Sequence, residues 1–220
     1  MIYEFNFWKA LVHPATSFYQ VSKTEKIYRL RSRIIVLFLC SFIIFMAAGF
    51  FGIGGESLSK DLTVLQPHEF EIRKALFALG KGFSGLGYAA ILTFFTALLF
   101  WVFTGIDYKK LLVFQSLVLG IHLIEIAVNG LLLLTAGLPW YSSPFSLGVL
   151  LQSMNAKNFF IYLFGSISLF KGWAIYLQYK GLRACIEKSR AAILGIVIGV
   201  NLAYWIITAV LAYIDFHAIL

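Results

Sequence analysis

The sequence predicts an all-α, polytopic membrane protein built as a bundle of five transmembrane helices. The first observation is composition: 60% of the 220 residues are hydrophobic and only 13% are charged, about half the charged fraction of a typical soluble domain. The second is a mean hydropathy of +0.86. The third is that the basic residues stand between the apolar stretches, where orientation signals belong. We therefore expect a multi-pass protein of the cell membrane.

A helix needs about 20 mostly apolar residues to cross the hydrocarbon core. Lipid offers the backbone no hydrogen bonds, so each crossing segment must be helical. The stretches that meet this length are residues 34–53, 83–106, 111–136, 158–177 and 191–213. We expect residues 34–213 to form one five-span domain, with an external tail at 214–220.

The distribution of lysine and arginine predicts the orientation. Twelve of these residues fall before the first span and in the second-to-third and fourth-to-fifth connections, and five fall in the loops 54–82 and 137–157. The positive-inside rule places the richer side in the cytoplasm. The N-terminus is therefore expected inside, and the C-terminus and the two poorer loops outside. This placement favours membrane topology over nucleic-acid binding as the reason for the net charge of +8.

The cytoplasmic arm, residues 1–33, reads as two short amphipathic helices that are separated at Pro14. Trp8, Leu11 and Val12 share one face of the first helix, which is typical of a helix that lies at the membrane interface. In the outer loop 54–82, a helical pattern is expected to lead into the second span.

Polar residues inside the spans are the candidate functional groups. In the third span, four of them project within about 80° of one another on a helix that turns 100° per residue: Gln115, His122, Glu125 and Asn129. The fourth span adds Lys171 and the fifth adds Asn201. One interpretation is a proton or ion relay, and the favoured one is a set of internal hydrogen bonds that fixes helix packing.

Three interpretations are open for Lys171. Depth arithmetic sets its backbone about 9 Å from that of Glu125 along the membrane normal, which a lysine side chain can largely span. The lysine can also snorkel to the cytoplasmic headgroups, and the arithmetic slightly favours this placement. A role in substrate handling is the third interpretation.

Motifs for chemistry are sparse. "GFSG" at 82–85 matches the GxSG serine of rhomboid-like proteases through Ser84, but no matching histidine motif follows. No zinc motif or phosphate-binding loop is found. We therefore expect no enzyme, no cofactor and no metal site. Gly195 and Gly199 form a GxxxG pattern that predicts close helix packing.

Two stretches carry a family resemblance. "FWKALVHPATSFYQV" at 7–21, with Trp8 and Pro14, and "FGSISLFKGWAIYLQYKGLR" at 164–183, with Trp173 and Gly181, resemble the signatures of bacterial Yip-domain proteins. The segment 188–200 resembles the fifth span of that family. The sequence is similar to those members that accompany MacB-type ABC exporters in Bacillus and are linked to protection against an antimicrobial toxin.

The resemblance implies a non-enzymatic membrane adaptor or modulator. Its expected partners are the lipid bilayer and other membrane proteins, with ABC exporter subunits among them, and a homo-oligomer is left open. An alternative is a small proton- or ion-coupled transporter that uses Glu125 as its titrating group and Lys171 as the counter-charge.

Overall fold

The computed structural model describes residues 2–4, 7–55 and 66–214, so the predicted tail lies almost wholly outside the described residues. The described part is helical apart from a small ribbon in which β1 (Ile2–Glu4) pairs in parallel with β2 (Lys26–Tyr28). The helices are α1 (Phe7–Val12), α2 (Pro14–Ser22), α3 (Leu30–Phe50), α5 (Pro67–Ala90), the π-helical η1 (Ile91–Phe95), α6 (Thr96–Thr104), α7 (Tyr108–Ala136), the 3-10 turn η2 (Trp140–Ser142), α8 (Gly148–Ser153), α9 (Asn158–Gly165), α10 (Leu169–Cys185) and α11 (Arg190–Tyr213).

Four helical segments are long and apolar enough to cross a membrane within the described part of the chain. They are Leu30–Phe50, His68–Thr104, Tyr108–Ala136 and Arg190–Tyr213. They coincide with the first, second, third and fifth predicted spans, which are thereby confirmed as long apolar helices. The protein is accordingly a helical protein suited to a membrane.

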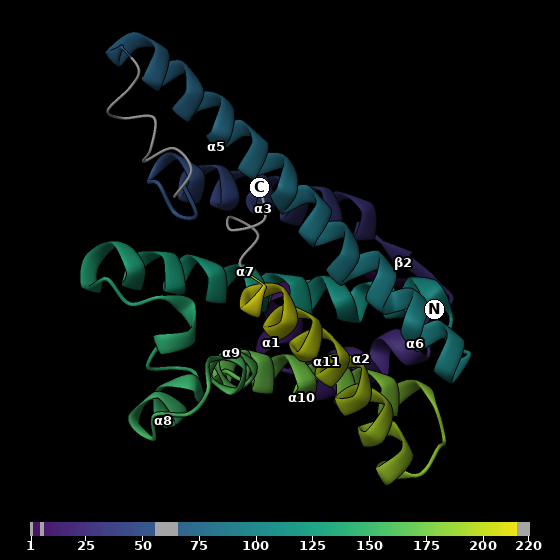
Figure 1. Cartoon of the computed structure of the whole chain (residues 1–220). Coiled ribbons are helices and arrows are strands. Elements are labelled where there is room, and N and C mark those ends of the chain that lie inside the picture. Colours follow the sequence, from purple (N-terminus) through teal and green to yellow (C-terminus); the bar gives the residue numbers. More distant parts are fainter. Residues whose placement is uncertain (1, 5–6, 56–65, 215–220) are drawn as a thin grey trace.

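The fourth predicted span, residues 158–177, is wrong as a continuous helix. The chain leaves helical geometry after α9 and re-enters it at Ser168, the N-cap residue of α10. Figure 1 looks down the axis of α9, whereas α10 runs across the view. Gly165, Ser166 and Ser168 are weak helix formers, and serine favours the N-cap position. Local sequence therefore permits the break, although hydropathy does not reveal it.

The second span is longer than expected. α5 begins at Pro67 and continues through η1 into α6. The 37 residues His68–Thr104 thus form one rod of about 55 Å. Residues 67–82 are thus part of this helix, as the helical pattern indicated, and the expected outer loop 54–82 shrinks to the segment before Pro67. Residues 56–65 of that loop lie outside the described residues.

α3 packs antiparallel against α5 through small residues. A Cβ atom added at Gly82 would lie 2.7 Å from the Phe42 ring, and one at Gly85 would lie 2.9 Å from the Ser41 carbonyl oxygen. Ser41 Oγ also donates to the Gly85 carbonyl oxygen at 2.7 Å. The two glycines of "GFSG" therefore serve helix packing, and Ser84 Oγ donates to the Lys81 carbonyl oxygen of its own helix at 2.7 Å.

The arm packs against the bundle. α1 contacts α7, and α2 contacts α10. The Phe18 ring lies 4.9 Å from that of Phe114 in an edge-to-face pair. The three residues expected on one face of α1 differ in exposure: Leu11 is 6% exposed, whereas Trp8 and Val12 are 70% and 69% exposed. Leu11 belongs to the core because the arm folds back on α7, and this leaves Trp8 and Val12 on the outer surface.

α7 is the central helix. It crosses the middle of Figure 1, with α3 and α5 on one side and α10 on the other. Its residues Phe114, Leu117 and Ile121 are at most 1% exposed. Because α7 is enclosed over this stretch, polar side chains on it must find partners inside the protein.

Candidate functional site

Glu125 of α7 meets the start of α10. Ser168 Oγ donates to Glu125 Oε1 at 2.5 Å and accepts from the Lys171 backbone N at 3.2 Å. At the N-terminus of a helix, the first backbone N–H groups and the positive end of the helix dipole point toward the groups next to the N-cap residue. Next to Ser168 lies the carboxylate of Glu125. The break in the fourth span therefore gives Glu125 a favourable electrostatic partner, the N-terminus of α10.

Lys171 supplies the second positive charge. Its Nζ lies 4.0 Å from Glu125 Oε1, which is an ion pair within the bundle. The slight preference for a snorkelling lysine is therefore wrong. An offset of about 9 Å would hold for a continuous fourth helix. In the structure the lysine stands in the first turn of α10, and its Nζ reaches Glu125.

The chain around the break is held by the segment that precedes α9. Leu147 N donates to the Ile167 carbonyl oxygen, and Leu169 N donates to the Phe145 carbonyl oxygen, both at 3.0 Å. A Cβ at Gly165 would lie 2.8 Å from Tyr141 Cβ. The predicted outer loop 137–157 is therefore packed on the bundle at this point. It folds against the break, because backbone groups freed from a helix need partners when water is scarce.

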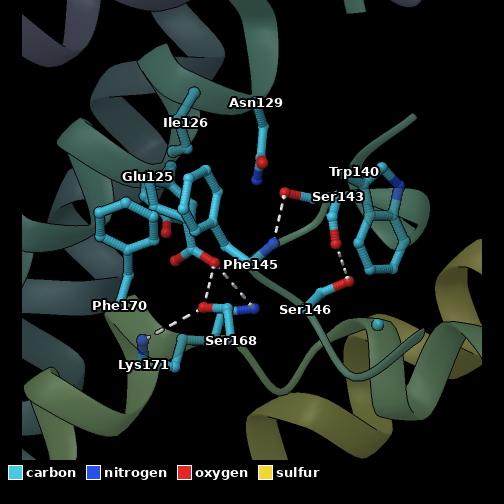
Figure 2. A pocket seen from close by; sticks show the side chains of 12 residues that line it. Glu125, Ile126, Asn129, Trp140, Ser143, Phe145, Ser146, Ser168, Phe170 and Lys171 are labelled. Carbon is cyan, nitrogen blue, oxygen red and sulfur yellow. Dashed lines mark hydrogen bonds and ion pairs between the residues drawn. The ribbon is translucent and has the colours of Figure 1, made fainter. Parts of the chain in front are cut away.

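These elements enclose a cavity of about 150 Å³. Figure 2 shows Glu125, Ser168 and Lys171 converging on one side and Asn129 pointing in from the next turn of α7. The lining combines these polar groups with aromatic rings and hydroxyls, namely Tyr88, Glu125, Ile126, Asn129, Trp140, Ser143, Phe145, Ser146, Gly165, Ser168, Phe170 and Lys171.

A second polar layer lies nearer the start of α7. Asn201 Nδ2 donates to Gln178 Oε1 at 2.7 Å, and Gln178 Nε2 donates to Gln115 Oε1 at 3.3 Å. This chain of amides ties α11, α10 and α7 together. It is separated from Glu125 by ten residues of α7, or about 15 Å.

The polar residues predicted on one face of α7 therefore fall into two groups. Gln115 joins Asn201 in the amide layer, and Glu125 and Asn129 reach the cavity with Lys171. His122 Nδ1 contacts only the Val118 carbonyl oxygen of its own helix, at 2.9 Å, among the described hydrogen bonds. Gln178 of α10 was not predicted as one of these polar contacts. The signal for it was its seven-residue spacing from Lys171, which puts both residues on one face of α10.

Gly195 and Gly199 do not pack closely against another of the helices that the structure describes. A Cβ atom added at either would meet no heavy atom within 4 Å in the described structure. They lie in a groove of about 550 Å³ between α6 and α11, whose other lining residues are Leu99, Phe103, Ala192, Ile196, Val200 and Ala203. The expected packing face exists as an open surface.

The residues of the family resemblance occupy different settings. Trp8 and Trp173 are exposed, Pro14 begins α2, and Gly181 faces the Phe114 ring, 2.7 Å from an added Cβ. Gly181 thus permits α10 to approach α7 closely. No group of three or more His, Cys, Asp or Glu residues that could hold a metal ion occurs among the described residues.

The fold and site define a class: a helical protein with four helices able to cross a membrane, a broken helix between the third and last of them, and a buried ion pair at the break. Comparison of the chain with protein-family models, with curated proteins and with solved structures finds no match.

Proposed function

We propose that this chain is a non-enzymatic membrane adaptor that binds a helix of another membrane protein in the groove between α6 and α11. The observation that carries the proposal is the exposed stripe of small residues on α11. Gly195, Gly199 and Ala203 follow one another at four-residue spacing, and each stands in the groove.

The opposite face of α11 explains why this stripe is available. Ile193 and Val197 are at most 1% exposed, and Asn201 belongs to the amide layer. The helix is thus held to its own bundle by one face only. In lipid, helices associate through close backbone approach at small residues, because there is no hydrophobic force between them. A groove floored by glycine suits such an approach.

The partner we propose is a transmembrane helix of an ABC exporter, as the resemblance to Yip-domain proteins implies. In this role the chain would modulate an exporter that protects against an antimicrobial peptide or toxin. A second copy of the chain is the competing occupant.

We further propose a fifth crossing made by α9, the break and α10, with the N-terminus in the cytoplasm and the C-terminus outside. A cysteine introduced at Glu187 should react with an impermeant maleimide only from the cytoplasmic face, and one at Met154 only from outside. The reverse pattern would contradict this orientation.

The adaptor proposal predicts that Gly195→Leu weakens the complex. A leucine would fill the groove and hold the partner helix away, and overpacking of a close contact costs about 1–3 kcal/mol, or roughly 5–150-fold in affinity. The measurement is the yield of partner that co-purifies with tagged chain from mild detergent.

The matched control is Gly87→Leu, which adds the same side chain to an equally open glycine of α5. Equal partner yields from native chain, Gly195→Leu and Gly87→Leu would refute the groove as the docking site.

The transporter alternative is favoured by one observation, the ion pair beside a cavity at a helix break, a setting typical of substrate and ion sites in transporters. Uptake or efflux that is abolished by Glu125→Gln, while partner binding is retained, would support it.

A further inference from the structure

The cavity at the break contains polar groups whose bonding capacity is incompletely used. Glu125 is 6% exposed. In the described part of the chain its carboxylate accepts a hydrogen bond from Ser168 and forms an ion pair with Lys171. Asn129 points into the same space, and its amide has no hydrogen-bond partner in the described part of the chain. Buried polar groups normally have partners, so a polar ligand that reached Glu125 and the Asn129 amide would complete this site.

The two charged groups of the ion pair are too far apart for a direct hydrogen bond. Their 4.0 Å separation exceeds the range of about 2.7–2.9 Å that is typical of an ammonium–carboxylate hydrogen bond. Lys171 Nζ can therefore turn toward an anionic group in the cavity while Glu125 keeps the hydroxyl of Ser168. The pair offers one positive and one negative contact a few ångströms apart.

The walls favour an ammonium group beside Glu125. The rings of Phe145 and Phe170 lie next to this carboxylate in Figure 2 and contact each other edge to face, with centroids 5.7 Å apart. Trp140 and Tyr88 are the other aromatic residues of the lining. Aromatic faces attract cations, and the attraction strengthens where water is excluded.

From this geometry we propose that the cavity binds a small zwitterion that carries an ammonium and an acidic group close together. The ammonium contacts Glu125 beside the aromatic rings, and the anionic group contacts Lys171 and the Asn129 amide. A zwitterion leaves the cavity neutral, whereas a lone cation or anion would leave an uncompensated buried charge. A free α-amino acid and the phosphoethanolamine headgroup of a lipid share this chemistry.

This site lies apart from the α6–α11 groove and does not depend on the adaptor role. The test uses the full chain in phosphatidylglycerol nanodiscs with L-alanine as the probe, and ethylamine and propionate as its two half-molecules. We expect L-alanine to raise the thermal midpoint and to bind about tenfold or more tightly than either half.

A second set of nanodiscs contains phosphatidylethanolamine. A raised midpoint together with lost L-alanine binding in these discs would identify the lipid headgroup as the ligand, and unchanged L-alanine binding would identify the free zwitterion. A midpoint that responds neither to L-alanine nor to phosphatidylethanolamine would overturn the proposal.

Asn129→Leu is the diagnostic variant. It replaces an unpartnered amide by a side chain of similar size, so the ligand-free midpoint should hold while affinity for the zwitterion falls about tenfold or more. Asn158→Leu, at an exposed position at the start of α9, is the control that should bind normally. Unchanged affinity in Asn129→Leu, or half-molecules that bind as tightly as L-alanine, would refute the site.

Discussion

At the scale of single residues, the structure explains why a lysine stands in an apolar stretch. A charge placed in the bilayer costs at least about 2.5–3.5 kcal/mol. Lys171 stands in the first turn of α10, and its Nζ lies 4.0 Å from the buried carboxylate of Glu125. Ser168 adds a short hydrogen bond to the same oxygen. Each of the two charges therefore offsets part of the cost of burying the other inside the bundle.

This pairing predicts non-additive effects on stability. Glu125→Gln or Lys171→Met alone leaves a buried charge without its partner and should lower the free energy of unfolding by about 3 kcal/mol. The double variant removes both charges and should cost clearly less than the sum of the two single variants. Thermal unfolding in detergent measures the cycle.

Glu187→Gln and Lys157→Met provide the control cycle, since both residues are exposed and should show no coupling. Fully additive losses at Glu125 and Lys171 would mean that the ion pair does not contribute to stability.

At the scale of elements, the broken fourth span is the feature that organises the site. α10 begins where it does because Ser168 caps it and because Glu125 lies beyond the cap. The segment 140–153 then supplies backbone partners on either side of the break. The cavity thus exists because one predicted helix is divided in two.

Ser168→Ala should therefore destabilise the protein beyond the loss of an ordinary cap. The substitution removes the N-cap, worth about 1 kcal/mol, and a hydrogen bond to a charged group, worth about 1.5–3 kcal/mol. Ser153→Ala, which removes an exposed hydroxyl that bonds within its own turn, should be nearly neutral. Equal thermal midpoints for the two variants would contradict the role assigned to Ser168.

The long helices could be predicted from the sequence, whereas the break in the fourth span could not. The four long helices followed from hydropathy, because an apolar run of 20 residues has few alternatives. The break at 166–168 could not be read from hydropathy, since Ile167 and the flanking Phe164 and Leu169 are all apolar. The break is stabilised by contacts with residues distant in sequence, namely Glu125, Phe145 and Leu147, and no local pattern reports such contacts.

The site was predicted in part for the same reason. Helical periodicity put Gln115, His122, Glu125 and Asn129 on one face of α7, and three of them do face other elements. Their division into two layers depends on which residues of α10 come near, and that depends on where α10 begins. The contribution of Ser168 was therefore out of reach of the sequence.

At the scale of the whole molecule, α7 is the central helix, and it contributes residues to both polar layers. The arm covers part of it, with Phe18 on Phe114, and Lys110 Nζ donates to the Ser22 carbonyl oxygen at 2.6 Å. The α3–α5 pair stands on one side and the α10–α11 pair on the other (Figure 1). The small-residue face of α11 is left open on the surface of this assembly.

We propose that this open face binds a helix of another membrane protein. The most direct measurement is photo-cross-linking in native membranes from a diazirine amino acid at position 195, with position 87 as the control and mass spectrometry of the adducts. We expect a protein adduct at position 195 that maps to a transmembrane segment of an exporter and is absent at position 87. Adducts to lipid alone at both positions, or adducts to a second copy of this chain, would contradict it.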